Sequence, residues 1–321
     1  MIKQYHIENH QLIPDTGTNS TICVYINPDQ TEKEYLVHTL CIDEHTLASA
    51  LDPDELARLE FEADHVALII KRPKNYSFED NFLFKVASLG MFLFKERLVV
   101  VVSEDIPLFD GKQFLRISSL RDIILRLMYR CVFHYLEHLK VINQISDEIE
   151  QKVNQSMENR HLLNMFSLEK SLVYYLNSIN SNAAVIERLK MNSAKVEFTP
   201  DNIEFLDDLM IENQQCFKQA EIYSNIISSL MDARAGIVNN NLNVLIKRLT
   251  VINIVFMPLN LIAGIGGMSE YSMMTRHIPW PVAYGTFSLG MIFLGLLTYA
   301  IINRIGSQKK SRRLGRFRKG A

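Results

Sequence analysis

The sequence lacks most of the features that mark enzymes, secreted proteins and small metal-binding domains. Its four cysteines are scattered over 321 residues, with no C-x-x-C pair and no zinc-site spacing, which predicts free thiols. It has no glycine-rich nucleotide-binding motif, no nucleophile elbow and no convincing pair of catalytic carboxylates. The first residues, MIKQYHIENHQLIPD, have no apolar core of signal-peptide length. We therefore expect a protein that is not an enzyme, has no covalently bound cofactor and keeps its first domain in the cytoplasm.

Charged residues are absent from two long stretches near the C-terminus. Residues 249–268 hold twenty residues without a charge, and residues 282–302 form a second uncharged stretch. About 20 apolar residues are enough for a helix to cross the hydrocarbon core of a bilayer. Trp280 and Tyr284 stand where the second stretch begins, and aromatic side chains are typical of membrane interfaces. The sequence therefore predicts two transmembrane helices.

Acidic residues are absent from the tail, residues 304–321, which carries eight of the 34 basic residues. Lys247 and Arg248 precede the first span, whereas residues 269–279, between the spans, hold one acid and one arginine. By the positive-inside rule, both termini face the cytoplasm and residues 269–279 form an extracytoplasmic loop. We expect the tail to contact anionic lipids of the cytoplasmic (inner) membrane rather than nucleic acid.

The part before the spans reads as a mixed domain followed by helices. Residues 1–120 alternate helical segments with β-rich runs, which predicts an α/β domain. Within it, the segment DPDELARLEFEA is expected to start a helix near residues 52–54, and the β-rich runs lie at 21–26, 66–71 and 98–103. In residues 121–198 apolar residues recur at three- and four-residue spacing, so we expect an antiparallel helical hairpin.

Proline is absent between Pro200 and Pro258. Apolar residues recur at helical spacing through this interval and continue into the first span. We expect one helix through residues 199–268, on the order of 100 Å long at 1.5 Å per residue. Such a helix would connect the cytoplasmic domain directly to the membrane.

A stripe of polar and small residues runs along one face of the first span. Its members recur at steps of three, four or seven: Asn243, Thr250, Asn253, Met257, Asn260, Gly264 and Gly267. Polar side chains at bilayer depth are costly unless they meet a partner or water. The stripe indicates either hydrogen bonds in a dry helix bundle or a water-lined axis, and we favour the axis. One chain with two spans cannot enclose an axis, so this interpretation implies a homo-oligomeric pore.

The run FMPLNLIAGIGGMSE, the two C-terminal spans and the basic tail resemble the CorA-type divalent-cation transporters, including their ZntB-like branch. The upstream segments LDPDELARLE, VALIIKRP and ASLGMFLFKERLVVVV are also similar to that family. The resemblance implies an α+β membrane protein that assembles as a funnel-shaped homopentamer. A cytoplasmic α/β/α domain would carry a long stalk helix that continues into the first transmembrane helix. The second transmembrane helix, residues 280–303, would form an outer ring.

The same resemblance implies a filter at the outer mouth. The family's motif is Gly-Met-Asn, and Gly267, Met268 and Ser269 stand in its place, so a serine replaces the asparagine that receives the hydrated cation. Glu270 follows directly, and five copies of its carboxylate would concentrate cations at the mouth. In the alternative interpretation Glu270 is a solvated acid that pairs with a loop neighbour. The serine leaves both Mg²⁺ and Zn²⁺ open as the transported ion.

Deeper positions follow from the resemblance and the stripe together. Leu249 and Met257 would form apolar constrictions that gate by dewetting. The complete pore-lining set is Asn243, Leu249, Asn253, Met257, Asn260 and Gly264. Asp208 and Asp232 match acids of regulatory cation sites between subunits, where a bound divalent cation would hold the pore closed. Both aspartates could equally be ordinary solvated acids.

Two histidines give a weaker signal. His134 and His138 lie four residues apart on an expected helix, a spacing that can ligate zinc. A third ligand is missing from the sequence pattern, so we expect surface or partly buried histidines.

The residues and the resemblance together favour divalent-cation transport, through a pore that the resemblance implies is homopentameric. The expected partners are further copies of the chain, membrane lipids and the cations. The alternative is a CorA-like membrane scaffold or sensor that has lost efficient transport. Ser269 in the filter and the missing aromatic residue at Gly266 motivate that alternative.

Overall fold

The computed structural model describes residues 1–15, 20–76, 82–155 and 159–317. Within these ranges, the side chains of residues 152–161, 266, 270–272 and 302–317 are not described. The chain divides into two compact units, residues 1–232 and 233–321, which are considered separately below.

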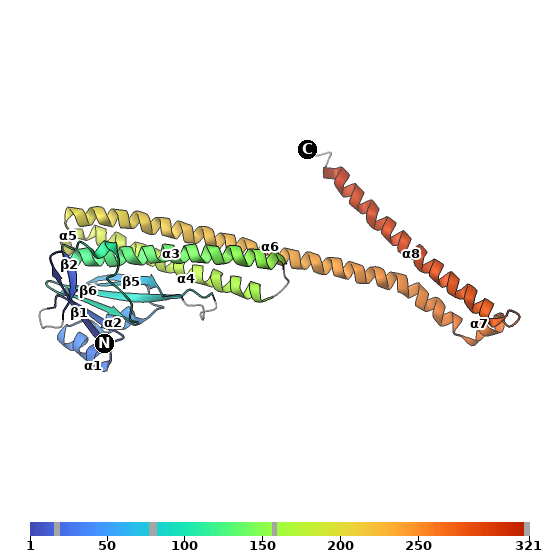
Figure 1. Cartoon of the computed structure of the whole chain (residues 1–321), viewed down its shortest axis with the longest axis horizontal. Helices are drawn as coiled ribbons and strands as arrows, with labels where there is room; N and C mark the ends of the chain where they lie inside the picture. The colour runs from blue at the N-terminus through green and yellow to red at the C-terminus, as the bar shows by residue number, and fades with distance from the viewer. Residues whose placement is uncertain (16–19, 77–81, 156–158, 318–321) are drawn as a thin grey trace. The chain divides into compact units, whose positions relative to one another are not determined.

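A seven-stranded sheet is the centre of the first unit (Figure 1). Its order is β2-β1-β3-β7-β6-β5-β4, and all neighbours are antiparallel except β3 and β7, which are parallel. The strands are β1 (Ile2–Glu8), β2 (Gln11–Pro14), β3 (Ile22–Ile26), β4 (Arg58–Phe61), β5 (His65–Pro73), β6 (Val86–Phe94) and β7 (Leu98–Val102). Every residue of β3 and β7 is buried, as is typical of strands covered on both faces. The three predicted β-rich runs coincide with β3, β5 and β7 and are confirmed.

Helices cover both faces of this sheet and make the unit an α/β/α sandwich (Figure 1). One face carries the π-helical turn η1 (Tyr35–Thr39), which continues the short helix α1 (Gln30–Glu34), and helix α2 (Glu44–Leu51). Helix α2 approaches the sheet closely at Gly90 of β6, where an added Cβ would lie 2.5 Å from the Cβ of Ala50. A larger residue at position 90 would collide with α2, so glycine is required there for packing.

The prediction of a helix that starts near residues 52–54 is wrong. Helix α2 has already ended at Leu51, and the later part of the segment forms strand β4. The Asp54 N–H donates to the side-chain carboxylate of Asp52 at 2.8 Å, which makes a turn in place of a helical start. Leu59 is fully buried opposite Leu68 of β5, so pairing with a neighbouring strand has overridden the helical propensity of the segment.

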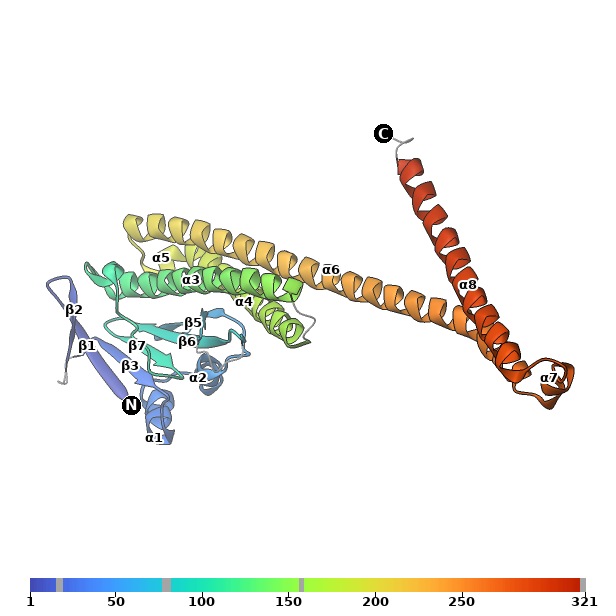
Figure 2. The ribbon, with the colours of Figure 1, turned by 45° about the vertical axis from the view of Figure 1, so that its right-hand side comes forward.

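Long helices cover the other face: α3 (Leu120–Gln155), α4 (Asn159–Met191), the single turn α5 (Ser193–Val196) and α6 (Pro200–Gly266). The antiparallel pair α3 and α4 confirms the predicted hairpin (Figure 2). The predicted single helix is confirmed as α6, which runs for 67 residues. Thr199 and Asn202 cap its start, since the side chain of each accepts the backbone N–H of the other at 3.3 Å.

The second unit consists of the C-terminal part of α6, the short helix α7 (Ser269–Met274) and α8 (Trp280–Phe317). Residues 269–279, expected as a loop, therefore contain a helical turn and a half. Helices α6 and α8 each contain a segment long and apolar enough to cross a membrane, and neither segment is buried within the chain. The side chains of the basic tail, residues 304–321, lie outside the described part, although the backbone of α8 continues to Phe317.

Lys71 of β5 is a buried cation that fastens the end of α2 to the sheet. Its Nζ donates to the carbonyls of Asp52 at 3.2 Å and Pro53 at 2.8 Å and to Ser88 Oγ at 2.8 Å. Burial lowers the pKa of Lys71 from 10.5 to about 8, and the negative charges of nearby acids offset only part of this shift.

We expect the stability of the soluble unit to rise as the pH increases from about 8 to about 10.5. In that window the unfolded chain still holds the Lys71 proton and the folded chain has released it, so alkali favours folding. The gain is about 3.5 kcal/mol, for about 2.5 pKa units at about 1.4 kcal/mol each. Urea unfolding at several pH values would measure it, and Lys71→Met should remove this part of the slope. An unchanged slope in the variant would contradict the assignment.

Candidate functional site

The candidate pore segment belongs to the part of α6 that lies in the second unit. Partly buried residues occupy one of its faces: Val251, Val255, Pro258, Leu259 and Ile262. This face meets α8, because Leu259 Cδ1 lies 3.5 Å from the position that a Cβ would take at Gly295. Ala283, Phe287, Met291, Leu294, Gly295 and Thr298 form the corresponding buried or partly buried face of α8. The first and second spans therefore pack through defined faces within one chain.

The predicted pore-lining residues, which are stripe residues except for Leu249, lie on the opposite side of α6. Asn243, Leu249, Asn253, Met257, Asn260 and Gly264 are all exposed, Met257 with 73% of its surface. At 3.6 residues per turn, the stripe is centred about half a turn from the face that meets α8. The amides of Asn253 and Asn260 are thus not packed against the second span of their own chain. Whether they line a pore stays a prediction, because a symmetry axis involves further copies.

The filter residues lie at the junction of α6 and α7. The last turn of α6 tightens there, since the Gly267 N–H donates to the carbonyls of Ala263 at 3.1 Å and Gly264 at 3.2 Å. Met268 and Ser269 are exposed, and Ser269 begins α7. The side chain of Glu270 lies outside the described residues, so its place at the mouth stays a prediction.

The two candidate regulatory aspartates lie on α6 and are exposed. Asp207, next to Asp208, forms an ion pair with Lys190 of α4, whereas Asp208 itself points away from the core. Among the described residues there is no group of three or more histidine, cysteine, aspartate or glutamate side chains that could hold a metal. A cation site at Asp208 or Asp232 would therefore need ligands from another subunit or from water.

His134 is half-buried in the helical layer, as expected, whereas His138 is buried there and lies deeper than expected. His138 Nδ1 lies 2.6 Å from the Tyr175 hydroxyl, and the rings of His134 and His138 are 4.4 Å apart. Burial is the main cause that lowers the pKa of each histidine to about 4, so both are neutral at pH 7. Among the described residues, no further histidine, cysteine, aspartate or glutamate joins them in a group that could hold a metal.

The sequence reasoning missed a polar cavity on the soluble unit. Arg72 of β5 and Arg130 and His134 of α3 line it together with residues of the 103–111 loop. These residues are far apart in the sequence and have no motif spacing. A basic residue within the hydrophobic strand β5 was the one available signal.

A soluble α/β/α unit whose last helix continues into the first of two apolar C-terminal helices defines a class: membrane proteins with two C-terminal spans and a large soluble domain. The family model described as CorA-like Mg²⁺ transporter protein matches residues 22–304. The chain therefore belongs to the CorA family of divalent-cation transporters.

Individual relatives agree with this assignment. The cobalt/magnesium transport protein CorA of Methanocaldococcus jannaschii is 25% identical over 253 residues, which are 76% of this chain and 78% of that protein. The complete structure of the CorA magnesium transporter from the same organism superposes with a TM-score of 0.75 at 20% identity, covering 94% of this chain and 96% of that one. The ZntB cytoplasmic domain of Vibrio parahaemolyticus gives a TM-score of 0.57 at 15% identity, covering 74% and 98%.

Proposed function

We propose that the protein passes Mg²⁺ or Zn²⁺ through a central pore formed by five copies of α6. The observation that carries the proposal is the exposed stripe from Asn243 to Gly264, on the face of α6 opposite α8. Polar amides that face lipid would be costly, so water and neighbouring copies are their favourable surroundings. Five α6 helices around the axis, with α8 outside, would give that arrangement.

The proposal includes an orientation and an energy source. Both termini lie in the cytoplasm, the basic tail contacts anionic lipid, and α7 lies outside the membrane. A potential of about 100 mV favours entry of a divalent cation by roughly 4–5 kcal/mol, at about 2.3 kcal/mol per charge. Nucleotide hydrolysis is not required for uptake. In the funnel-shaped pentamer, the soluble units would surround the cytoplasmic entrance.

Gating would use the apolar and acidic residues of α6. Leu249 and Met257 are exposed on or beside the stripe, where rings of apolar side chains dewet a narrow pore. Asp208 and Asp232 are exposed and available to a neighbouring copy. A cation bound between subunits would offset the repulsion of these acids and favour the closed state.

The transport proposal is tested with purified protein in liposomes that contain Mg²⁺- or Zn²⁺-sensitive dyes, under an imposed inside-negative potential. We expect uptake of at least one of the two ions, above that of protein-free liposomes and dependent on the potential. No uptake of either ion across pH and voltage would contradict the proposal. It would favour the alternative of a membrane scaffold or sensor.

Ser269→Asn should raise Mg²⁺ uptake relative to Zn²⁺ uptake by several-fold. The asparagine amide reaches further than the serine hydroxyl and both donates to and accepts from water, so it suits a cation that keeps its hydration shell. The same dye assay measures the ratio. Ser288→Asn is the matched control, because Ser288 is an exposed serine on α8 and outside the filter. Equal changes of the uptake ratio in both variants would mean that Ser269 is not part of the filter.

A further inference from the structure

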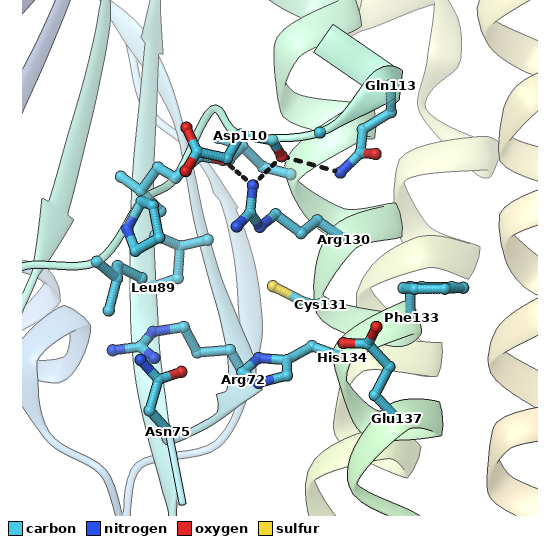
Figure 3. A pocket seen from close by; sticks show the side chains of 15 residues that line it. Arg72, Asn75, Leu89, Asp110, Gln113, Arg130, Cys131, Phe133, His134 and Glu137 are labelled. Carbon is cyan, nitrogen blue, oxygen red and sulfur yellow. Dashed lines mark hydrogen bonds between the residues drawn. The ribbon is translucent and has the colours of Figure 1, made fainter. Parts of the chain in front are cut away.

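The cavity on the soluble unit lies between strand β5, the loop after β7 and helix α3 (Figure 3). Its volume is about 310 Å³, at the small end of the range of ligand pockets. Its polar lining consists of Arg72, Asn75, Asp110, Gln113, Arg130, His134 and Glu137. The transport proposal uses none of these residues.

Arg130 supplies unused hydrogen-bond donors at the wall of the cavity. Its Nη1 donates to the backbone carbonyls of Leu108 at 3.3 Å and Asp110, which fixes the guanidinium against the loop (Figure 3). Its Nε and Nη2 make no hydrogen bond to any residue in the described ranges. A fixed guanidinium with free N–H groups is pre-organised to bind a carboxylate or a phosphate.

Arg72 adds a second positive charge from the sheet. Its side chain is only 4% exposed, and its Nη2 lies 2.7 Å from the carboxylate of Glu104. Glu104 also contacts Lys74 at 3.4 Å, so this one acid is shared between two cations. The Nε of Arg72 is buried and has no hydrogen-bond partner in the described structure. The positive charges of Arg72 and Lys74 are therefore only partly balanced by the carboxylate of Glu104.

The ring of His134 lies close to the charges of both arginines. Burial and, after it, the charges of Arg72 and Arg130 lower the pKa of His134 to about 4. No acid is among the causes of this shift, although Glu137 lies one turn further along α3. The imidazole is thus neutral at pH 7 and has an N–H to donate. The two arginines are the charged groups that act on this ring, while the carboxylates of Asp110 and Glu137 lie further out.

We propose that this cavity binds a small anion with a carboxylate or phosphate group. The free N–H groups of Arg130 and the ring of His134 hold the anion, and Arg72 supplies charge from behind. The exposed carboxylates of Asp110 and Glu137 at the rim disfavour extended polyanions, so the ligand is small. Binding connects β5, the 103–111 loop and α3, and the bound anion stabilises the soluble unit.

Binding is tested on the full-length protein in detergent by calorimetry and thermal unfolding. Inorganic phosphate and citrate are the probes, with chloride at equal ionic strength as the reference. We expect saturable binding of one or both and a rise in the unfolding midpoint with concentration. The probe that binds identifies the group as phosphate or carboxylate. If neither binds beyond chloride, the proposal is wrong.

The variants are Arg130→Gln and its control Arg126→Gln. Arg126 lies one turn earlier on α3, bonds Asp122 at 2.8 Å and the Gln113 carbonyl, and does not line the cavity. Arg130→Gln should weaken binding about tenfold or more, whereas Arg126→Gln should change it less than about twofold. Equal weakening would mean that the loss is one of general charge or folding, and would overturn the assignment. His134→Asn gives a second test that leaves the loop contacts intact.

The pH dependence of sulfate binding provides an independent readout, since sulfate keeps its charge throughout. A bound anion stabilises the protonated imidazole, so affinity should rise as the pH falls from 7 to 5 and His134→Asn should flatten this rise. Glu137→Gln should keep the rise, which would separate the histidine from the nearest acid on its helix. A rise that persists in His134→Asn would contradict the role of His134. The charged and titratable groups around the ring are Arg72 from β5, Asp110 from the loop, and Arg130, Glu137 and His138 from α3.

Discussion

Replacing Asn260 with leucine should abolish cation uptake in liposomes while leaving the oligomer assembled. Asn260 is exposed on the stripe face of α6, away from the face that meets α8. In the proposed pore, five amides at this level would bind the water around a passing cation. Five leucines would instead form an apolar ring that excludes water. We expect uptake to fall at least about tenfold, because each amide lost removes a hydrogen bond that the hydrated ion needs.

The control for this variant is Thr286→Leu on α8. It makes a similar polar-to-leucine change in the other span. Among the described residues, the Thr286 hydroxyl bonds only to carbonyls of its own helix, at 2.9 and 3.0 Å. Its uptake should stay close to that of the unmodified protein. Size-exclusion chromatography with light scattering checks that both variants assemble alike. Normal cation uptake by the Asn260→Leu variant in an intact oligomer would mean that the stripe does not line the permeation path.

The helical part of the molecule was predictable because its signals are local in the sequence. The uncharged stretches at 249–268 and 282–302 and the lack of proline after Pro200 need no knowledge of the fold. The structure places α6 and α8 where these signals fall. The same holds for β3, whose residues are all buried and apolar.

The errors and omissions arise where distant residues decide the outcome. Residues 58–61 have helical propensity, yet they form β4 because β5 offers a strand to pair with. The cavity joins Arg72 to Arg130 across 58 positions of sequence, and no spacing rule connects them. The stripe was visible in the sequence, but its role depends on identical copies, which the order of residues in one chain does not reveal. The structure adds that the face of α6 opposite the stripe is the one that packs against α8. Periodicity alone did not distinguish the two faces.

Asn182→Leu should strongly destabilise the soluble unit, because Asn182 makes two buried hydrogen bonds to strand β5. Strand β4 pairs with β5 only as far as Ile69, so the backbone of Lys71 has no strand beside it on that edge. Asn182 of α4 takes the place of the missing strand. Its Oδ1 accepts the Lys71 N–H and its Nδ2 donates to the Lys71 carbonyl, both at 2.7 Å. Asn182 is 3% exposed, so water cannot substitute freely.

Leucine at position 182 would leave a buried N–H and a buried carbonyl without partners. Each such group costs about 1–3 kcal/mol, so we expect a loss of about 2–6 kcal/mol in the free energy of unfolding. Urea unfolding of a fragment of residues 1–232 measures it, since this unit contains both residues.

The matched control is Asn180→Leu, which makes the same substitution at an exposed position of α4 two residues earlier. Surface changes of this kind stay within about 0.5 kcal/mol. A similar free energy for Asn180→Leu and Asn182→Leu would mean that Lys71 finds other partners, and that the α4 side chain is not needed to complete the sheet edge. A large difference would assign the cost to the two hydrogen bonds between Asn182 and the backbone of Lys71. The contact that closes the sheet would then be one amide side chain, placed 111 residues from the strand it completes.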